Sequence, residues 1–233
     1  PPGGPDFART PDKRLFVMAK TKETLGQESA SRRYAMYMHE IRSRLKVIGK
    51  SGAGLQASRP LTGLLATDAE MCFLNFRKIL ELIMYASVLA HEHAGAEISK
   101  RIANREWNAR RIFSYLEDVN PNFYPNPVRS IDRSTDPPST VSLIEGFLEK
   151  EQFLYLYDNK CGRMLHASRQ YVIHEPYVAP VEEIREWFNR IWLLLGHHWI
   201  QLSDQLCFAV ILTLKDSDAI QVAPMGLVES AGD

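Results

Sequence analysis

The feature that most constrains the fold is an apolar stretch from Met71 to Ala90, whose hydrophobic residues do not keep to one helix face. Thr67 and Glu70 precede it with the spacing of a capping box, in which each side chain satisfies a free backbone N–H at a helix start. A helix that is apolar on almost every side is typically buried on every side. The sequence therefore predicts a central helix surrounded by other helices. Its apolar residues are Phe73, Phe76, Ile79, Leu80, Ile83, Met84, Val88 and Leu89.

Three charged residues, Arg77, Lys78 and Glu81, interrupt this stretch. Charged side chains are costly in hydrocarbon, so the sequence predicts neither a membrane span nor a membrane partner. Arg77 and Glu81 stand four residues apart, which places them on one helix face where they can form an ion pair. Burial of such a pair requires further polar neighbours, because desolvation offsets the attraction between the two charges.

Four further helices are predicted from apolar residues that recur every three or four positions. The first of these four helices is expected to end at Gly49, with residues 49–54 as a flexible link. The third of them is expected to begin at a second capping-box spacing, formed by Ser142 and Glu145. Pro180 suits the first turn of the last helix. The four predicted ranges are 31–48, 97–119, 142–165 and about 180–198.

Two short segments near the C-terminus, Leu206–Leu214 and Ala219–Ala223, are rich in apolar and β-branched residues and flank a turn-like sequence. Two strands alone are marginally stable in water, so a hairpin at about 206–223 is expected to pack on the helices. The predicted fold is mainly α, a five-helix bundle with a central apolar helix and a short C-terminal β-hairpin. It forms a single domain over residues 31–233, after a flexible basic N-terminal segment over residues 1–30.

The formal net charge is zero, but the charges are unevenly distributed. Residues 1–60 carry 12 Lys and Arg against 5 Asp and Glu, so the remaining chain is acidic by the same amount. A basic segment can bind nucleic acid through counterion release, or it can bind an acidic protein partner. It can equally dock on the acidic remainder of its own chain, which is the simplest interpretation.

The sequence contains few of the motifs that mark catalytic or cofactor sites. Cys72, Cys161 and Cys207 are far apart and form no C-x-x-C pair, which indicates reduced thiols and a cytoplasmic location. The seven histidines lack the spacing of a helical metal site, and neither a G-x-S-x-G elbow nor a glycine-rich dinucleotide loop is present. The sequence therefore predicts no metal site and no cofactor.

The segment from Cys161 to Arg169 gathers two arginines, a histidine and a thiol within nine residues, and His174 follows shortly after. Cys161 and His166 are five residues apart, which turns them away from each other on a helix, so Cys161 is expected to be a small buried hydrophobe. Four residues are predicted to bind, and three of them, Arg77, Glu81 and His166, are expected to form an internal polar network. The fourth is Arg163.

Three segments together resemble uncharacterised bacterial proteins of unknown function. They are Phe76–Leu82, Trp107 with Asn120–Pro125, and Cys161–Ala167. The helical layout is more distantly similar to the HEPN superfamily of helical bundles, many of which are ribonucleases of defence and toxin systems. Their hallmark is an arginine, usually followed by a polar residue, with a histidine several residues later, and Arg169, Gln170 and His174 have this spacing. Here the motif falls in a predicted loop, whereas the family carries it on a helix.

Two hypotheses follow from these observations. The first, slightly favoured, is a binding or assembly module whose basic N-terminal region engages nucleic acid or a protein partner. The second, implied by the HEPN resemblance, is a metal-independent endoribonuclease. In that enzyme His174 would act as general base on a ribose 2′-hydroxyl and Arg169 would stabilise the charge on the reacting phosphate. This chemistry usually needs two facing copies of the site, so the second hypothesis requires a homodimer.

Overall fold

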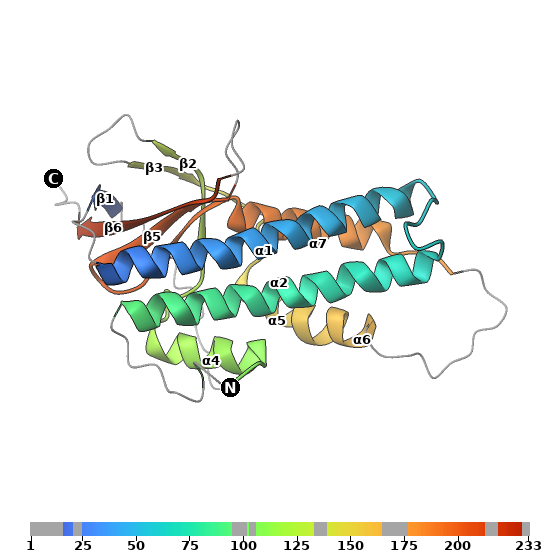
Figure 1. Ribbon diagram of the computed structural model, residues 1–233, viewed down its shortest axis with the longest axis horizontal. Helices are drawn as coiled ribbons and strands as arrows, with labels where there is room; N and C mark the ends of the chain where they lie inside the picture. The colour runs from blue at the N-terminus through green and yellow to red at the C-terminus, as the bar shows by residue number, and fades with distance from the viewer. Residues whose placement is uncertain are drawn as a thin grey trace, which may run out of the picture.

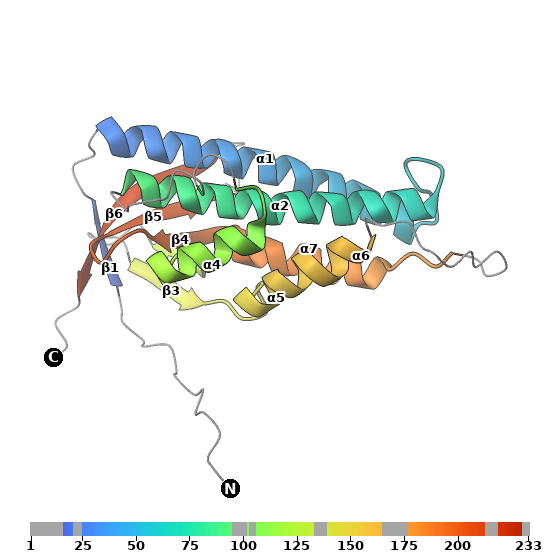
Figure 2. The same cartoon turned by 90° about the horizontal axis from the view of Figure 1, so that it is seen from below.

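The computed structural model describes residues 16–20, 25–94, 102, 106–132, 139–164, 177–212 and 219–229. Two long helices, α1 (Leu25–Gln56) and α2 (Leu65–His93), lie side by side along the molecule (Figure 1). Shorter helical elements pack beneath them, and an antiparallel sheet lies at one end (Figure 2). The short elements are α4 (Ala109–Val119), α5 (Lys150–Tyr155), the π-helix η1 (Leu156–Cys161), α6 (Gly162–Met164) and α7 (Val181–Leu195).

The sheet has six strands in the order β1-β6-β5-β4-β2-β3, and all neighbouring strands are antiparallel. Strands β4, β5 and β6 follow one another in the chain, and β1 joins the edge beside β6. The sheet packs on the first half of α1, where Tyr34 contacts Phe208 edge to face. The strands are β1 (Phe16–Lys20), β2 (Asn126–Asp132), β3 (Ser139–Leu143), β4 (His197–Gln201), β5 (Leu206–Ile211) and β6 (Gln221–Glu229).

The molecule is mainly helical with an antiparallel sheet, and helix α2 buries the apolar residues that the sequence predicts, whereas its Leu74 and Lys78 are exposed. It contacts α1, α4, α7 and η1, and every one of the eight apolar residues named for it is at most 6% exposed. The sheet is larger than predicted. Strands β5 and β6 pair with Leu206 opposite Gly226 and Ile211 opposite Gln221, but they lie inside a six-stranded sheet rather than forming an isolated hairpin.

The N-terminal boundary also differs from the prediction. Residues 16–20 form an edge strand paired with β6, and the first six residues of α1 lie before residue 31. The rest of the segment predicted to be flexible lies outside the described residues. The single domain predicted over residues 31–233 therefore has to be extended at its start.

Helix α1 does not end at Gly49, and no flexible link follows there. Gly49 and Gly52 face α7, and a Cβ atom at these positions would lie 4.0 Å from Phe188 Cε2 and 3.9 Å from Ile184 Cγ2. A methyl group at either position would make an ordinary van der Waals contact with α7, so these glycines are not required by the packing. Gly54, in contrast, is required, because a Cβ there would lie 2.8 Å from the Arg59 carbonyl oxygen, where the chain turns back.

Two other predicted helices differ from the structure, although the start predicted at about residue 97 itself lies outside the described residues. Residues 106–108 are not helical, and the Asn108 side chain caps α4 by accepting a hydrogen bond from the Arg111 backbone N–H. Ser142, predicted to open a helix, lies in β3. The helix after it begins at Lys150, where Glu149 and Gln152 make the reciprocal hydrogen bonds of a capping box.

Candidate functional site

The predicted Arg77–Glu81 ion pair forms, and Tyr157 of η1 completes it. Arg77 Nε lies 3.3 Å from Glu81 Oε1, and Arg77 Nη2 donates to the Tyr157 hydroxyl at 3.0 Å. That hydroxyl in turn donates to Glu81 at 3.3 Å and accepts from the Ala109 backbone N–H at 3.4 Å. The guanidinium also lies over the Tyr157 ring, 4.4 Å from its centroid. Each charged group in this cluster is therefore paired, which indicates a structural link between α2, η1 and α4.

The other predicted site residues do not join this cluster in the part of the chain that the structure describes. Arg163 lies on α6 and is exposed. His166, Arg169 and His174 lie outside the described residues, so the ribonuclease motif stays a prediction. The structure thus brings together Arg77 and Glu81, two of the four predicted binding residues.

The three cysteines are fully buried, free and unsuited to nucleophilic chemistry. Burial raises the pKa of Cys72, Cys161 and Cys207 to about 12 in each case, and for Cys161 the neighbouring Arg77 lowers it only in part. A thiol with such a pKa is protonated at neutral pH, and the thiolate is the nucleophilic form. Cys161 is the small buried hydrophobe that the sequence predicts.

The buried His91 has structural partners. His91 Nδ1 lies 2.7 Å from the Ser87 carbonyl oxygen, and His91 Nε2 accepts a hydrogen bond from Asn120 Nδ2 at 2.9 Å. Burial lowers the His91 pKa, and the backbone hydrogen bonds oppose this shift only in part. The same Asn120 amide donates to the Gln201 carbonyl oxygen. His91 is therefore a neutral link between α2, the end of α4 and the end of β4.

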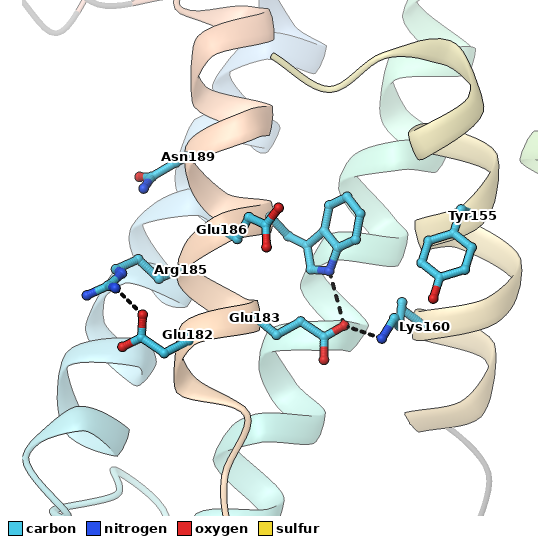
Figure 3. Close-up of a pocket in the computed structure, with 8 residues that line it drawn as sticks. Tyr155, Lys160, Glu182, Glu183, Arg185, Glu186 and Asn189 are labelled. Carbon is cyan, nitrogen blue, oxygen red and sulfur yellow. Dashed lines mark hydrogen bonds and ion pairs between the residues drawn. The ribbon is translucent and has the colours of Figure 1, made fainter. Parts of the chain in front are cut away.

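An open cleft of about 630 Å³ lies between α7 on one side and α5 with η1 on the other (Figure 3). The π-helix η1 carries Lys160 into it, and π-turns are often found at functional sites. Lys160 Nζ lies 2.7 Å from Glu183 Oε1, and Trp187 Nε1 donates to the same oxygen at 3.3 Å. The hydrogen bond to Glu183 raises the Lys160 pKa, so the amine stays charged.

The remaining charges of the cleft are also paired. Glu182 binds Arg185 one turn along α7, and Glu186 accepts from Arg190 Nη2 at 2.9 Å. Surface ion pairs of this kind contribute little to stability, but here they occupy the groups that a ligand would need. The cleft is therefore a poor candidate for a binding site.

The outer face of α1 differs from the cleft, because some of its charged side chains have no partner among the described residues. Exposed Arg32, His39, Lys46 and Lys50 follow one another at spacings of seven, seven and four residues, which places them on one side of the helix. Arg33 is exposed beside them. We call Arg32, Arg33, His39, Lys46 and Lys50 the basic face.

The cations of the basic face have few acidic neighbours. Glu40 is the only acidic residue from Ala30 to Gln56, and it binds Arg44 at 2.6 Å. Among the described residues, the side chains of Arg32, Arg33 and Lys50 have no hydrogen-bond or ion-pair partner. Docking of this helix on the acidic remainder of the chain, the simplest interpretation of the sequence, therefore does not neutralise these three charges within the described ranges.

No protein-family model matches this chain, and neither a curated protein nor a solved structure matches it. Within the described residues, no helix has both the length and the apolar character needed to cross a membrane. In the same ranges, no group of three or more His, Cys, Asp or Glu side chains could hold a metal ion. The basic face remains the surface whose chemistry points to a partner.

Proposed function

We propose that this chain is a binding module and that the basic face of α1 is its contact surface for nucleic acid. In this proposal α1, α2, α4, α7 and the short helices around η1 act as one bundle that holds the basic face rigid. The supporting observation is the set of three exposed cations, Arg32, Arg33 and Lys50, that have no partner among the described residues.

The length of α1 suits a phosphate backbone. Arg32 and Lys50 are eighteen residues apart, which corresponds to roughly 27 Å along a helix at 1.5 Å per residue. A nucleic acid strand laid along this face meets Arg32 and Arg33 at one end and Lys46 and Lys50 towards the other. Binding would release condensed counterions, which favours association without a specific base sequence.

The scaffold supports this role because α1 is firmly held on its inner side. Tyr34, Met38, Ile41, Leu45 and Ile48 are all at most 1% exposed. Arg42 and Arg44 lie partly buried at the flanks, where Arg44 donates to Asn75 of α2 at 3.0 Å. Changes confined to the outer face should therefore alter binding without altering the fold.

The direct test is the affinity for fluorescently labelled oligonucleotides, measured by anisotropy at low salt. The variant Arg32→Gln/Arg33→Gln/Lys50→Gln should bind at least tenfold more weakly than the unmodified protein. A matched control, Lys78→Gln/Arg111→Gln/Arg129→Gln, loses the same charge from exposed positions on α2, α4 and β2. This control should bind within about twofold of the unmodified protein.

Two results would overturn the proposal. One is the absence of binding to any single-stranded or duplex oligonucleotide at low salt. The other is an equal loss in the two triple variants, which would show that only total charge matters. Binding to anionic lipid vesicles but not to oligonucleotides would assign the basic face to a different partner and would also reject the proposal.

A further inference from the structure

An exposed aromatic pair lies next to the basic face. Phe188 and Trp192 of α7 stand one turn apart, and their rings are nearly parallel, at 11° with centroids 6.1 Å apart. Trp192 is 37% exposed and Phe188 is partly exposed. The two rings are stacked on each other, and the exposed part of Trp192 offers an aromatic surface to solvent.

The contacts between α1 and α7 place this pair beside the lysines. Gly49 faces Phe188, and Gly52, further along α1, faces Ile184, which is earlier in α7. The two helices are therefore antiparallel in this region, as Figure 1 also shows. Lys50 follows Gly49 directly, and Lys46, one turn earlier in α1, lies at the level of Trp192.

The residues around the pair favour an anionic ligand with exposed aromatic rings. Gly49, which faces Phe188, has no side chain, and its position is exposed. The acidic residues Glu182 and Glu186 of α7 are bound to Arg185 and Arg190. The aromatic pair therefore meets α1 at Gly49, and the next residue, Lys50, is a cation that has no partner among the described residues.

We infer that Phe188 and Trp192 form a base-stacking platform, and that the nucleic acid bound by this chain is single-stranded. This inference rests on the proposed function, because the basic face supplies the phosphate contacts. Bases stack on aromatic side chains whatever their sequence, and only unpaired bases have a free face for such contact. In a duplex the base faces are covered by their neighbours, so a duplex can use the basic face but not the platform.

The test compares single-stranded oligothymidine and oligouridine with a hairpin duplex, using Trp192→Ala, Trp192→Phe and a control, Trp107→Ala. Trp107 is 64% exposed but lies outside the basic face, next to Glu106. One stacked base is worth about 1–3 kcal/mol, so Trp192→Ala should bind single strands roughly 5- to 150-fold more weakly. Its affinity for the hairpin should stay within about twofold, and Trp107→Ala should bind both probes normally.

Trp192→Phe is the control for a change in folding, because phenylalanine keeps an aromatic ring at this position. It should bind single strands within a few-fold of the unmodified protein. Binding should also quench tryptophan fluorescence in the unmodified protein, and most of that quenching should be lost in Trp192→Phe. Thermal melts of each variant check that the helices stay folded.

The outcomes separate the two proposals. Unchanged single-strand affinity in Trp192→Ala, together with weak binding by the Arg32→Gln/Arg33→Gln/Lys50→Gln variant, would reject the platform and keep the basic face. Equal losses for the hairpin and for single strands would also reject the platform. If the unmodified protein binds none of the probes, both proposals fail.

Discussion

Tyr34 and His198 meet in the interior of the molecule, 164 residues apart in sequence, with the tyrosine hydroxyl 3.1 Å from His198 Nε2. His198 Nδ1 lies 2.9 Å from the Leu195 carbonyl oxygen, which can only accept, so Nδ1 carries the proton. Nε2 then accepts from Tyr34. This arrangement needs a neutral imidazole, and it joins α1 to the start of β4.

The first prediction concerns pH. Burial lowers the His198 pKa to about 4, against an unfolded value near 6.5. The stability that the neutral ring supplies is fully present above about pH 6.5 and is lost as the pH falls towards 4, because the unfolded state binds the proton more tightly. The loss should total about 3 kcal/mol over this range. Urea unfolding at pH 7, 6 and 5 measures it.

The control for this prediction is His198→Gln, whose side chain does not titrate. The free energy of unfolding of this variant should fall less between pH 7 and pH 5 than that of the unmodified protein. His91 is also buried with a lowered pKa, so some pH dependence should remain. An identical pH dependence in the two proteins would show that His198 is not the group responsible.

The second prediction concerns Tyr157. Phenylalanine at this position leaves the Ala109 N–H and one Arg77 N–H without their acceptor, and it removes a donor to Glu81. Buried groups that lose a partner cost about 1–3 kcal/mol, which corresponds to a melting temperature lower by roughly 2–12 °C. Thermal melting monitored by circular dichroism tests this. Tyr155→Phe, at a more exposed position on α5, should melt within about 1 °C of the unmodified protein; equal shifts in both variants would contradict the role given to Tyr157.

The third prediction compares two glycines of α1. Gly54→Ala places a Cβ 2.8 Å from the Arg59 carbonyl oxygen, a backbone atom that cannot move aside without disturbing the turn. Gly52→Ala meets only Ile184 at 3.9 Å and should stabilise the helix by about 0.5–1 kcal/mol. Chemical unfolding should therefore show opposite signs for the two variants. A stabilised Gly54→Ala would contradict the close approach at the end of α1.

The fourth prediction concerns the thiols. Because all three cysteines are fully buried, none should react with a thiol reagent such as dithionitrobenzoate within minutes under native conditions at pH 8. All three should react in denaturant. Rapid modification of one thiol in the native protein would show that its segment opens readily.

Helix α2 was predictable because its signal is local. Its apolar residues span many turns, and the Arg77–Glu81 pair follows from spacing alone. The identity of the third partner, Tyr157, was not predictable, because it comes from a distant helix. Its position depends on the π-turn of η1, which sequence periodicity does not reveal.

The sheet was largely missed for physical reasons. The residues His197–Ile200 extend the apolar pattern of α7, but Gly196 ends the helix and they form β4 instead. Strand β1 pairs with β6, which lies more than two hundred residues later in the chain. A pairing between segments so far apart leaves no pattern in the local sequence. The continuation of α1 through Gly49 was missed because glycine has a low helix propensity, which does not include the contacts that α1 makes with α2 and α7.

The basic face was visible in the sequence as an uneven charge distribution, but its availability was not. Only the structure shows that Glu40 is occupied by Arg44 while Arg32, Arg33 and Lys50 have no partner among the described residues. In the sequence, Phe188 and Trp192 fit the apolar pattern of the helix predicted over about 180–198. The exposure of this pair is evident only from the structure, in which Trp192 is 37% exposed.

The most direct test of nucleic acid binding through the basic face is the salt dependence of the association constant for a single-stranded oligonucleotide. The slope of log K against log salt changes by about 0.7 for each phosphate contact on a single strand. Loss of three contacts in Arg32→Gln/Arg33→Gln/Lys50→Gln should make the slope shallower by about 2, while Lys78→Gln/Arg111→Gln/Arg129→Gln should keep the slope of the unmodified protein. Equal slopes in all three proteins would show that the outer face of α1 does not contact phosphates.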